Sequence, residues 1–91
     1  MTGKIEIYVG NLPPQVNAGQ LSELFQHYGK VTAVRIITDK FSGLPRGFGF
    51  VEMPERDEAV LAIANLAGRD FHGGKLDVRE ALTKSHIKGN D

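Results

Sequence analysis

The sequence predicts an α+β fold with the element order strand, helix, strand, strand, helix, strand. Alternating apolar and polar residues mark the strand segments, because successive side chains of a strand point to opposite faces. Apolar residues spaced three and four apart mark the two intervening helices. This order is typical of the ferredoxin-like βαββαβ arrangement, in which two helices pack on one face of a four-stranded antiparallel sheet.

The strand segments share an aliphatic side opposed to a polar or aromatic side. We expect strands within residues 4–10, 30–39, 46–53 and 73–81, with the first and third at the centre of the sheet. A turn-rich loop at residues 39–45 separates the second strand from the third. The aliphatic sides should face the helices, and they are formed by Ile5, Ile7, Val9, Val34, Ile36, Val51, Met53, Leu76 and Val78.

The helices have recognisable ends. Asn17 is a good N-cap for the first helix, and Gly29 is expected to end it. The second helix falls within residues 54–68, where Gly68 is expected to end it. The apolar faces consist of Leu21, Leu24, Phe25 and Tyr28 in the first helix and Ala59, Ala62, Ile63 and Leu66 in the second.

The composition is that of an ordinary globular domain, 41% hydrophobic and 24% charged. Eleven basic residues balance eleven acidic ones, so a nucleic-acid partner would need a source of affinity other than net charge. No apolar run is long enough to span a membrane, and the N-terminus does not resemble a signal peptide, so we expect no membrane partner.

The cysteine and histidine content limits which disulfides and metal sites the protein can form. The chain has no cysteine, which excludes disulfides and thiolate metal sites and fits a reducing compartment. We therefore expect the protein in the cytoplasm, or in the nucleus or an organelle if its source is a eukaryote. The three histidines are scattered, so we expect no metal site and no cofactor.

The stretch "RGFGFVEM", residues 46–53, would place two large rings on one face of a strand. If Val51 and Met53 face the helices, Phe48 and Phe50 lie on the open face, and Gly47 and Gly49 let the strand approach the helices. Tyr8 should join them from the neighbouring strand, and three exposed rings on one face suggest a binding surface. The basic residues expected around the rings are Lys4, Arg35, Arg46, Lys75 and Arg79.

Two of these segments match a family signature. "IYVGNL" (residues 7–12) and "RGFGFVEM" (residues 46–53) resemble the hexapeptide and octapeptide of the RNA recognition motif. Seven of the eight octapeptide positions agree, and the exception is Met53, which is expected to face the core. The resemblance covers residues 4–81, which we take as the domain, and residues 82–91 form a polar tail expected to be flexible.

The resemblance implies a single-stranded RNA ligand, with single-stranded DNA left open. Tyr8 and Phe50 would each stack on a base, Phe48 would pack between sugars or against a ring, and Arg46 would pair with a phosphate. Main-chain groups from about Arg79 to Ala81 are expected to meet base edges. Further contacts are expected from Lys4, Asn11, Arg35, Lys40, Lys75 and Arg79.

The resemblance extends to the format of the chain, which is similar to small bacterial RNA-binding proteins or to the isolated domain of plant glycine-rich ones. A monomer acting as a post-transcriptional regulator or RNA chaperone is the expected role.

Two alternatives share the fold. One is a protein–protein interaction module, which usually lacks the aromatic residues found here. The other is an acylphosphatase-like enzyme, which needs an arginine in a phosphate-binding loop after the first strand. Residues 10–19 contain no arginine, and we expect no enzymatic activity.

Overall fold

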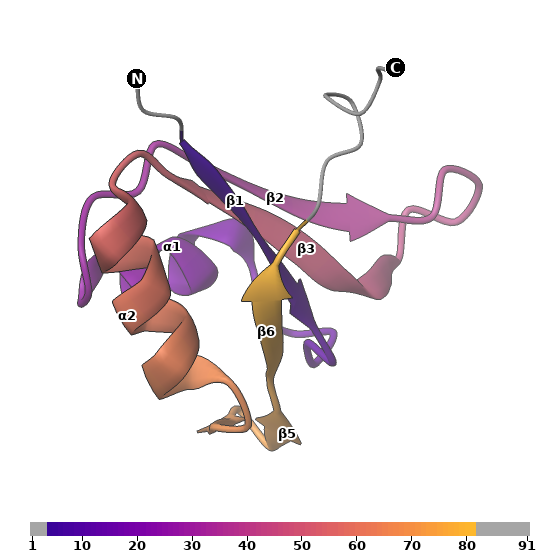
Figure 1. Ribbon diagram of the computed structural model, residues 1–91. Helices are drawn as coiled ribbons and strands as arrows, with labels where there is room; N and C mark the ends of the chain where they lie inside the picture. Colours follow the sequence, from indigo (N-terminus) through magenta and orange to yellow (C-terminus); the bar gives the residue numbers. More distant parts are fainter. Residues whose placement is uncertain (1–3, 82–91) are drawn as a thin grey trace, which may run out of the picture.

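The structure is a computed structural model that describes residues 4–81 (Figure 1). The predicted tail, residues 82–91, lies outside the described residues. The elements of the main fold are β1 (Ile5–Gly10), α1 (Ala18–Gln26), β2 (Ala33–Thr38), β3 (Pro45–Met53), α2 (Arg56–Leu66) and β6 (Asp77–Glu80). A short hairpin of β4 (Asp70–Phe71) and β5 (Gly74–Lys75) lies between α2 and β6.

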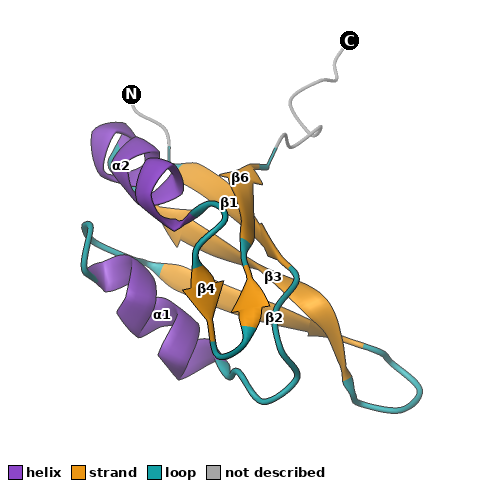
Figure 2. Ribbon diagram, turned by 90° about the horizontal axis from the view of Figure 1, so that it is seen from below, coloured by secondary structure: helices purple, strands orange, loops and turns teal. Residues whose placement is uncertain are grey.

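The main sheet has four antiparallel strands in the order β2-β3-β1-β6. Figure 2 shows both helices on one side of this sheet, and no described element covers the other side. The predicted fold and the central position of the first and third strands are therefore confirmed. The register of the central pair sets Tyr8 opposite Phe50, which brings their side chains to the same face.

The core lies between the sheet and the helices. Val51 and Met53 are fully buried there, as the alternation along β3 predicts. On α1, Leu21 and Phe25 are fully buried, whereas the predicted apolar residues Leu24 and Tyr28 are partly buried at the margin of the core. The pleat of β3 thus points its aromatic side to the open face.

The helix ends test three predictions. Asn17 caps α1 as predicted: its side chain accepts from the Gln20 amide at 2.8 Å, and the Gln20 side chain accepts from the Asn17 amide at 2.9 Å. Gly68 follows the cap of α2 with φ 79°, as expected of a helix-ending glycine. The prediction for Gly29 is wrong, because it lies outside the positive-φ region, and Glu58 instead accepts from the next amide, that of Lys30, at 2.9 Å.

The predicted fourth strand is interrupted. Its first residues form β5, which pairs with β4 through a two-residue turn at His72 and Gly73, both with positive φ. Only residues 77–80 join the main sheet. The placement of Lys75 on the open face of that sheet is therefore wrong.

The glycines of β3 have a different role from the one expected. Any side chain at Gly49 would clash with the backbone carbonyl of Arg35 in β2, so the close neighbour is a strand and not a helix. Gly47 has φ 88°, a conformation that disfavours other residues. Gly49 therefore permits the close approach of β2 to β3, and Gly47 permits the backbone conformation next to Phe48.

Candidate nucleic-acid interface

Three aromatic rings form a cluster on the open face of the sheet. The centroids of Tyr8 and Phe48 are 5.9 Å apart with a 30° angle between the ring planes. Phe50 meets Tyr8 at 6.0 Å and Phe48 at 6.1 Å, edge to face in both cases. These separations are within the favourable range for aromatic pairs, so the rings support each other while each stays partly exposed.

Two arginines lie over these rings. The Arg35 guanidinium is 5.3 Å from the centre of Phe50, and that of Arg79 is 5.3 Å from the centre of Tyr8. Each is also paired with a carboxylate: Arg35 with Glu6 at 3.4 Å, and Arg79 with Asp77 at 2.8 Å. The sequence-based placement of both arginines beside the rings is confirmed, and cation–π attraction adds to their positioning.

A shallow hollow of about 400 Å³ adjoins the cluster. It is lined by Tyr8, Phe50, Arg79, Glu80 and Ala81, so it lies between two of the three rings and the end of β6. The amide of Ala81 donates to the Glu6 carbonyl at 2.8 Å, which contradicts the expectation that this group is free to meet a base edge.

The remaining predicted contacts are spread over the rim. Lys4 pairs with Glu52 at 3.7 Å at the start of β1. Asn11, with φ 60°, donates its side-chain amide to the Lys75 carbonyl at 2.7 Å and so links the loop after β1 to β5. The Lys75 ammonium pairs with Asp70 at 3.2 Å within the small hairpin, away from the rings.

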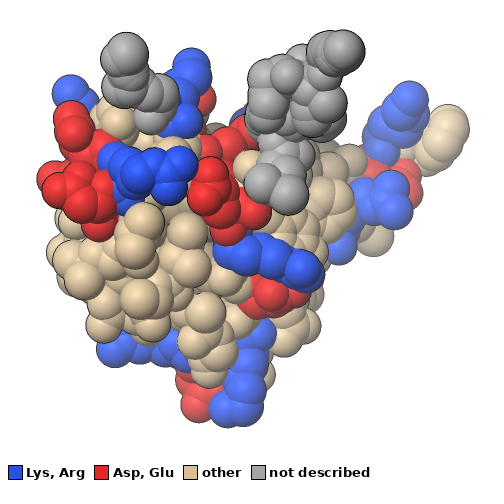
Figure 3. Space-filling view, in the orientation of Figure 1, with Lys and Arg blue, Asp and Glu red and all other residues tan. Residues whose placement is uncertain are grey.

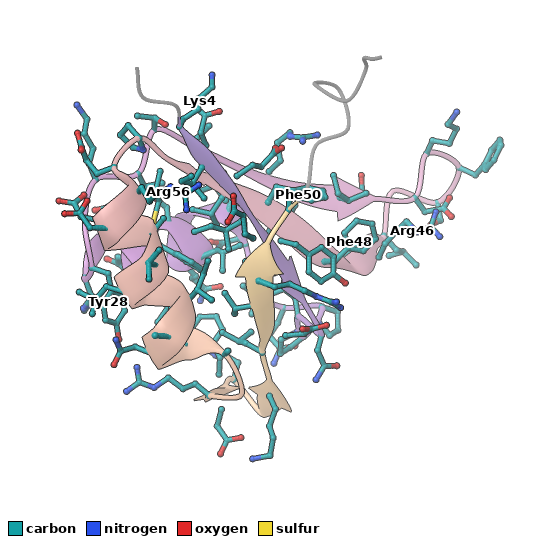
Figure 4. All side chains as sticks on the ribbon, viewed as in Figure 1. Lys4, Tyr28, Arg46, Phe48, Phe50 and Arg56 are labelled. Carbon is teal, nitrogen blue, oxygen red and sulfur yellow. The ribbon has the colours of Figure 1, made fainter. Side chains whose placement is uncertain are left out.

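Arg46 and Lys40 make no ion pair within residues 4–81, unlike the other cations predicted for the interface. Arg46 is exposed near the start of β3, and Figure 4 shows it beyond Phe48 toward the loop that joins β2 to β3. Lys40 is the basic residue of this loop, and Figure 3 shows basic and acidic side chains together on the projecting arm. The two interface cations without an ion pair in the described range therefore lie in or next to the loop between β2 and β3.

Phe41 escaped the sequence-based prediction of the interface. It lies in the loop between β2 and β3, and 92% of its surface is exposed. Leu44 in the same loop is 65% exposed. The sequence showed an aromatic residue inside a turn-forming segment. Side-chain periodicity gives no information there, because a loop has no regular repeat.

Neither a metal site nor a membrane span is evident in the part of the chain that the structure describes. No three histidine or acidic side chains in residues 4–81 are grouped so as to hold a metal ion. Among the helices of that range, none has the length and apolar character needed to cross a bilayer.

The open sheet, its ring cluster and its two signature strands define a member of a known family. The family model described as RNA recognition motif matches residues 7–77, and the chain belongs to this family. The sequence-based resemblance is thereby confirmed.

Relatives with similar sequences are found in plants and animals. The chain is 45% identical over 80 residues to the chloroplastic RNA-binding protein CP31B of Arabidopsis thaliana, a match that covers 86% of this chain and 28% of that protein. It is 35% identical over 80 residues to the cleavage stimulation factor subunit 2 tau variant of Homo sapiens, covering 88% and 13%. The chain thus spans less than a third of either relative.

Solved structures show the same arrangement. RNA binding protein PG1 matches with a TM-score of 0.85 and 49% identity, covering 87% of this chain and 95% of that one. A Sex-lethal protein–RNA complex matches with a TM-score of 0.78 and 40% identity, covering 84% and 47%.

Proposed function

We propose that this protein binds single-stranded RNA by stacking bases on the cluster of Tyr8, Phe48 and Phe50. The observation that carries the proposal is the cluster itself: three partly exposed rings in mutual contact on a sheet face that no described element covers. Aromatic side chains on this face are the means by which domains of this family stack bases. The names of the relatives, and the RNA in the Sex-lethal complex, support the same ligand class.

Each ring has a distinct position in the proposed complex. Tyr8 and Phe50 border the hollow, so each takes a base, and Phe48 packs against Tyr8 and against the sugars between the bases. The Arg35 guanidinium already lies over the Phe50 ring. When a base stacks on that ring, the guanidinium either packs against the base or pairs with a phosphate. Arg46 pairs with a phosphate, because it is exposed and makes no ion pair within residues 4–81.

The residues at the rim of the open face are proposed to make weaker contacts with the RNA. Lys4, Arg35 and Arg79 are each paired with a carboxylate. An RNA phosphate must therefore compete with Glu52, Glu6 and Asp77 for these cations. Lys40 contacts phosphate from the loop. Asn11 and Lys75 are proposed at the periphery only, because the Asn11 amide already donates to the Lys75 carbonyl.

The protein is proposed to bind its ligand without catalytic activity. The Leu12 amide, in the loop where an acylphosphatase would cradle phosphate, donates to the Gly47 carbonyl at 2.8 Å. We further propose that residues 4–81 form the binding domain, that the protein acts as a monomer, and that single-stranded DNA is an alternative ligand. The cytoplasm is the proposed compartment, or an organelle or the nucleus in a eukaryotic cell. Its proposed role is post-transcriptional regulation or RNA chaperoning.

Chemical-shift mapping with a random-sequence pool of single-stranded RNA tests the proposal. We expect the largest amide shifts in β1 and β3 at residues 8–10 and 46–50. The α1 and α2 amides, on the opposite side of the sheet, should change little. Shifts confined to the helices, or none at all up to millimolar RNA, would contradict it. A duplex RNA of the same composition is the control, because its paired bases cannot stack on the rings.

A further inference from the structure

The loop between β2 and β3 presents an apolar surface that the three-ring cluster does not include. Phe41 is 92% exposed and Leu44 is 65% exposed, and they lie three residues apart in the same loop. Such exposure leaves most of a large ring in water, which gives no benefit to the folded monomer. An exposed aromatic side chain next to a binding face is therefore a candidate for contact with the ligand.

This loop has an ordered network of hydrogen bonds. The Asp39 amide donates to the Leu44 carbonyl at 2.8 Å and the Gly43 amide donates to the Asp39 carbonyl at 2.7 Å, which closes the loop at its base. The Asp39 carboxylate accepts from the amides of Phe41 at 2.8 Å and Ser42 at 3.1 Å. These bonds fix the backbone on both sides of Phe41, so its ring is held outward by a defined turn.

The position of the loop connects it to the three-ring cluster. It leads directly into β3, the strand that carries Arg46, Phe48 and Phe50, and it projects past the edge of the sheet (Figure 1). Lys40 precedes Phe41, and within residues 4–81 neither Lys40 nor Arg46 is paired with a carboxylate. A single strand that runs from the rings past Arg46 to Lys40 reaches the residue next to Phe41.

We propose that Phe41 is a fourth stacking position, which takes a base of the same RNA strand beyond the bases held on the sheet. Lys40 then contacts the phosphate next to that base. The inference rests on the proposed function, because it extends the same RNA path. Aromatic stacking suits this position, since it works on any base and needs no groove to enclose the ligand.

The test compares wild type with Phe41→Ala on two random-sequence RNA pools, one of about three nucleotides and one of about eight. The short pool fills the sheet rings only, and the long pool also reaches the loop. We expect Phe41→Ala to weaken binding of the long pool by roughly 5- to 150-fold and to change the short pool by less than about 2-fold. Phe41→Tyr keeps a ring and should retain wild-type affinity for both pools.

A matched control is Leu61→Ala, which removes a side chain that is 51% exposed on α2 and should change neither affinity. The inference is overturned if Phe41→Ala leaves the long pool unaffected, or weakens both pools alike. It is also overturned if Phe41→Ala abolishes a wild-type dimer in analytical ultracentrifugation while RNA affinity stays unchanged, since a second copy would then cover the ring. Failure of the proposed function differs from all of these, because wild type would bind neither pool.

Discussion

Replacement of Phe50 by alanine separates binding from stability on the open face. The ring is partly exposed. Its centroid is 6.0 Å from that of Tyr8, 6.1 Å from that of Phe48 and 5.3 Å from the Arg35 guanidinium. Loss of a stacked base costs roughly 1–3 kcal/mol, which corresponds to roughly 5- to 150-fold weaker RNA binding. Because only aromatic contacts at the surface are removed, the free energy of unfolding should fall by no more than about 1–2 kcal/mol.

Val51→Ala is the matched control for this prediction, because Val51 is the next residue of β3 and is fully buried on the opposite face. It should lower the free energy of unfolding by about 2 kcal/mol through lost packing while leaving RNA affinity nearly unchanged. The assays are fluorescence anisotropy with a labelled single-stranded RNA and urea denaturation. If Phe50→Ala unfolds the domain, or if the valine variant is the one that loses RNA, the assignment of the two faces is wrong.

Three further predictions concern the core, the charges and the loop. Met53→Asp should abolish folding by burying a charge, whereas Met53→Phe should cost under about 1.5 kcal/mol if the site repacks; a well-folded aspartate variant by circular dichroism contradicts the observed pleat. Contact with roughly two to four phosphates predicts a log–log salt slope of about −1.5 to −3, and Arg46→Ala should make it shallower by about 0.7; an unchanged slope removes Arg46 from the phosphate contacts. Hydrogen bonds from the amides of Ser42 and Phe41 lower the pKa of Asp39 below its ordinary value of 3.8, so these two hydrogen bonds should be kept above that pH and lost as the pH falls through the lowered pKa. An NMR titration of the Phe41 amide checks this, and a midpoint above 3.8 contradicts it.

The sequence was most informative where side chains repeat with a regular period. A period of two along residues 46–53 gives the strand one aliphatic side and one aromatic side. Only one of them can face the helices, and the aliphatic side is the one buried against them. Val51 and Met53 are accordingly buried, and Phe48 and Phe50 meet Tyr8 on the open face. The capping of α1 by Asn17 was equally predictable, because it depends on a residue only three positions away.

Long-range and irregular features were less predictable. The turn at His72 and Gly73 requires positive φ at both positions, and histidine is not a usual residue there, so the hairpin that removes Lys75 from the sheet had only a weak signal. The pairing of Arg35 with Glu6 depends on two strands that lie on either side of β3, and sequence spacing does not report it.

Stacking of a base on Tyr8 is the most direct test of the account, and the chain permits it optically. The sequence has two tyrosines and no tryptophan, so the Tyr28→Phe variant leaves Tyr8 as the only emitting residue at tyrosine wavelengths. This change removes a single hydrogen bond, from Arg69 to the Tyr28 hydroxyl at 3.2 Å, and should keep the fold. Titration with single-stranded RNA should quench Tyr8 emission and saturate at the same concentration as the anisotropy of the labelled RNA. Saturating anisotropy with unchanged Tyr8 emission would contradict the account, because RNA would then bind without using the rings.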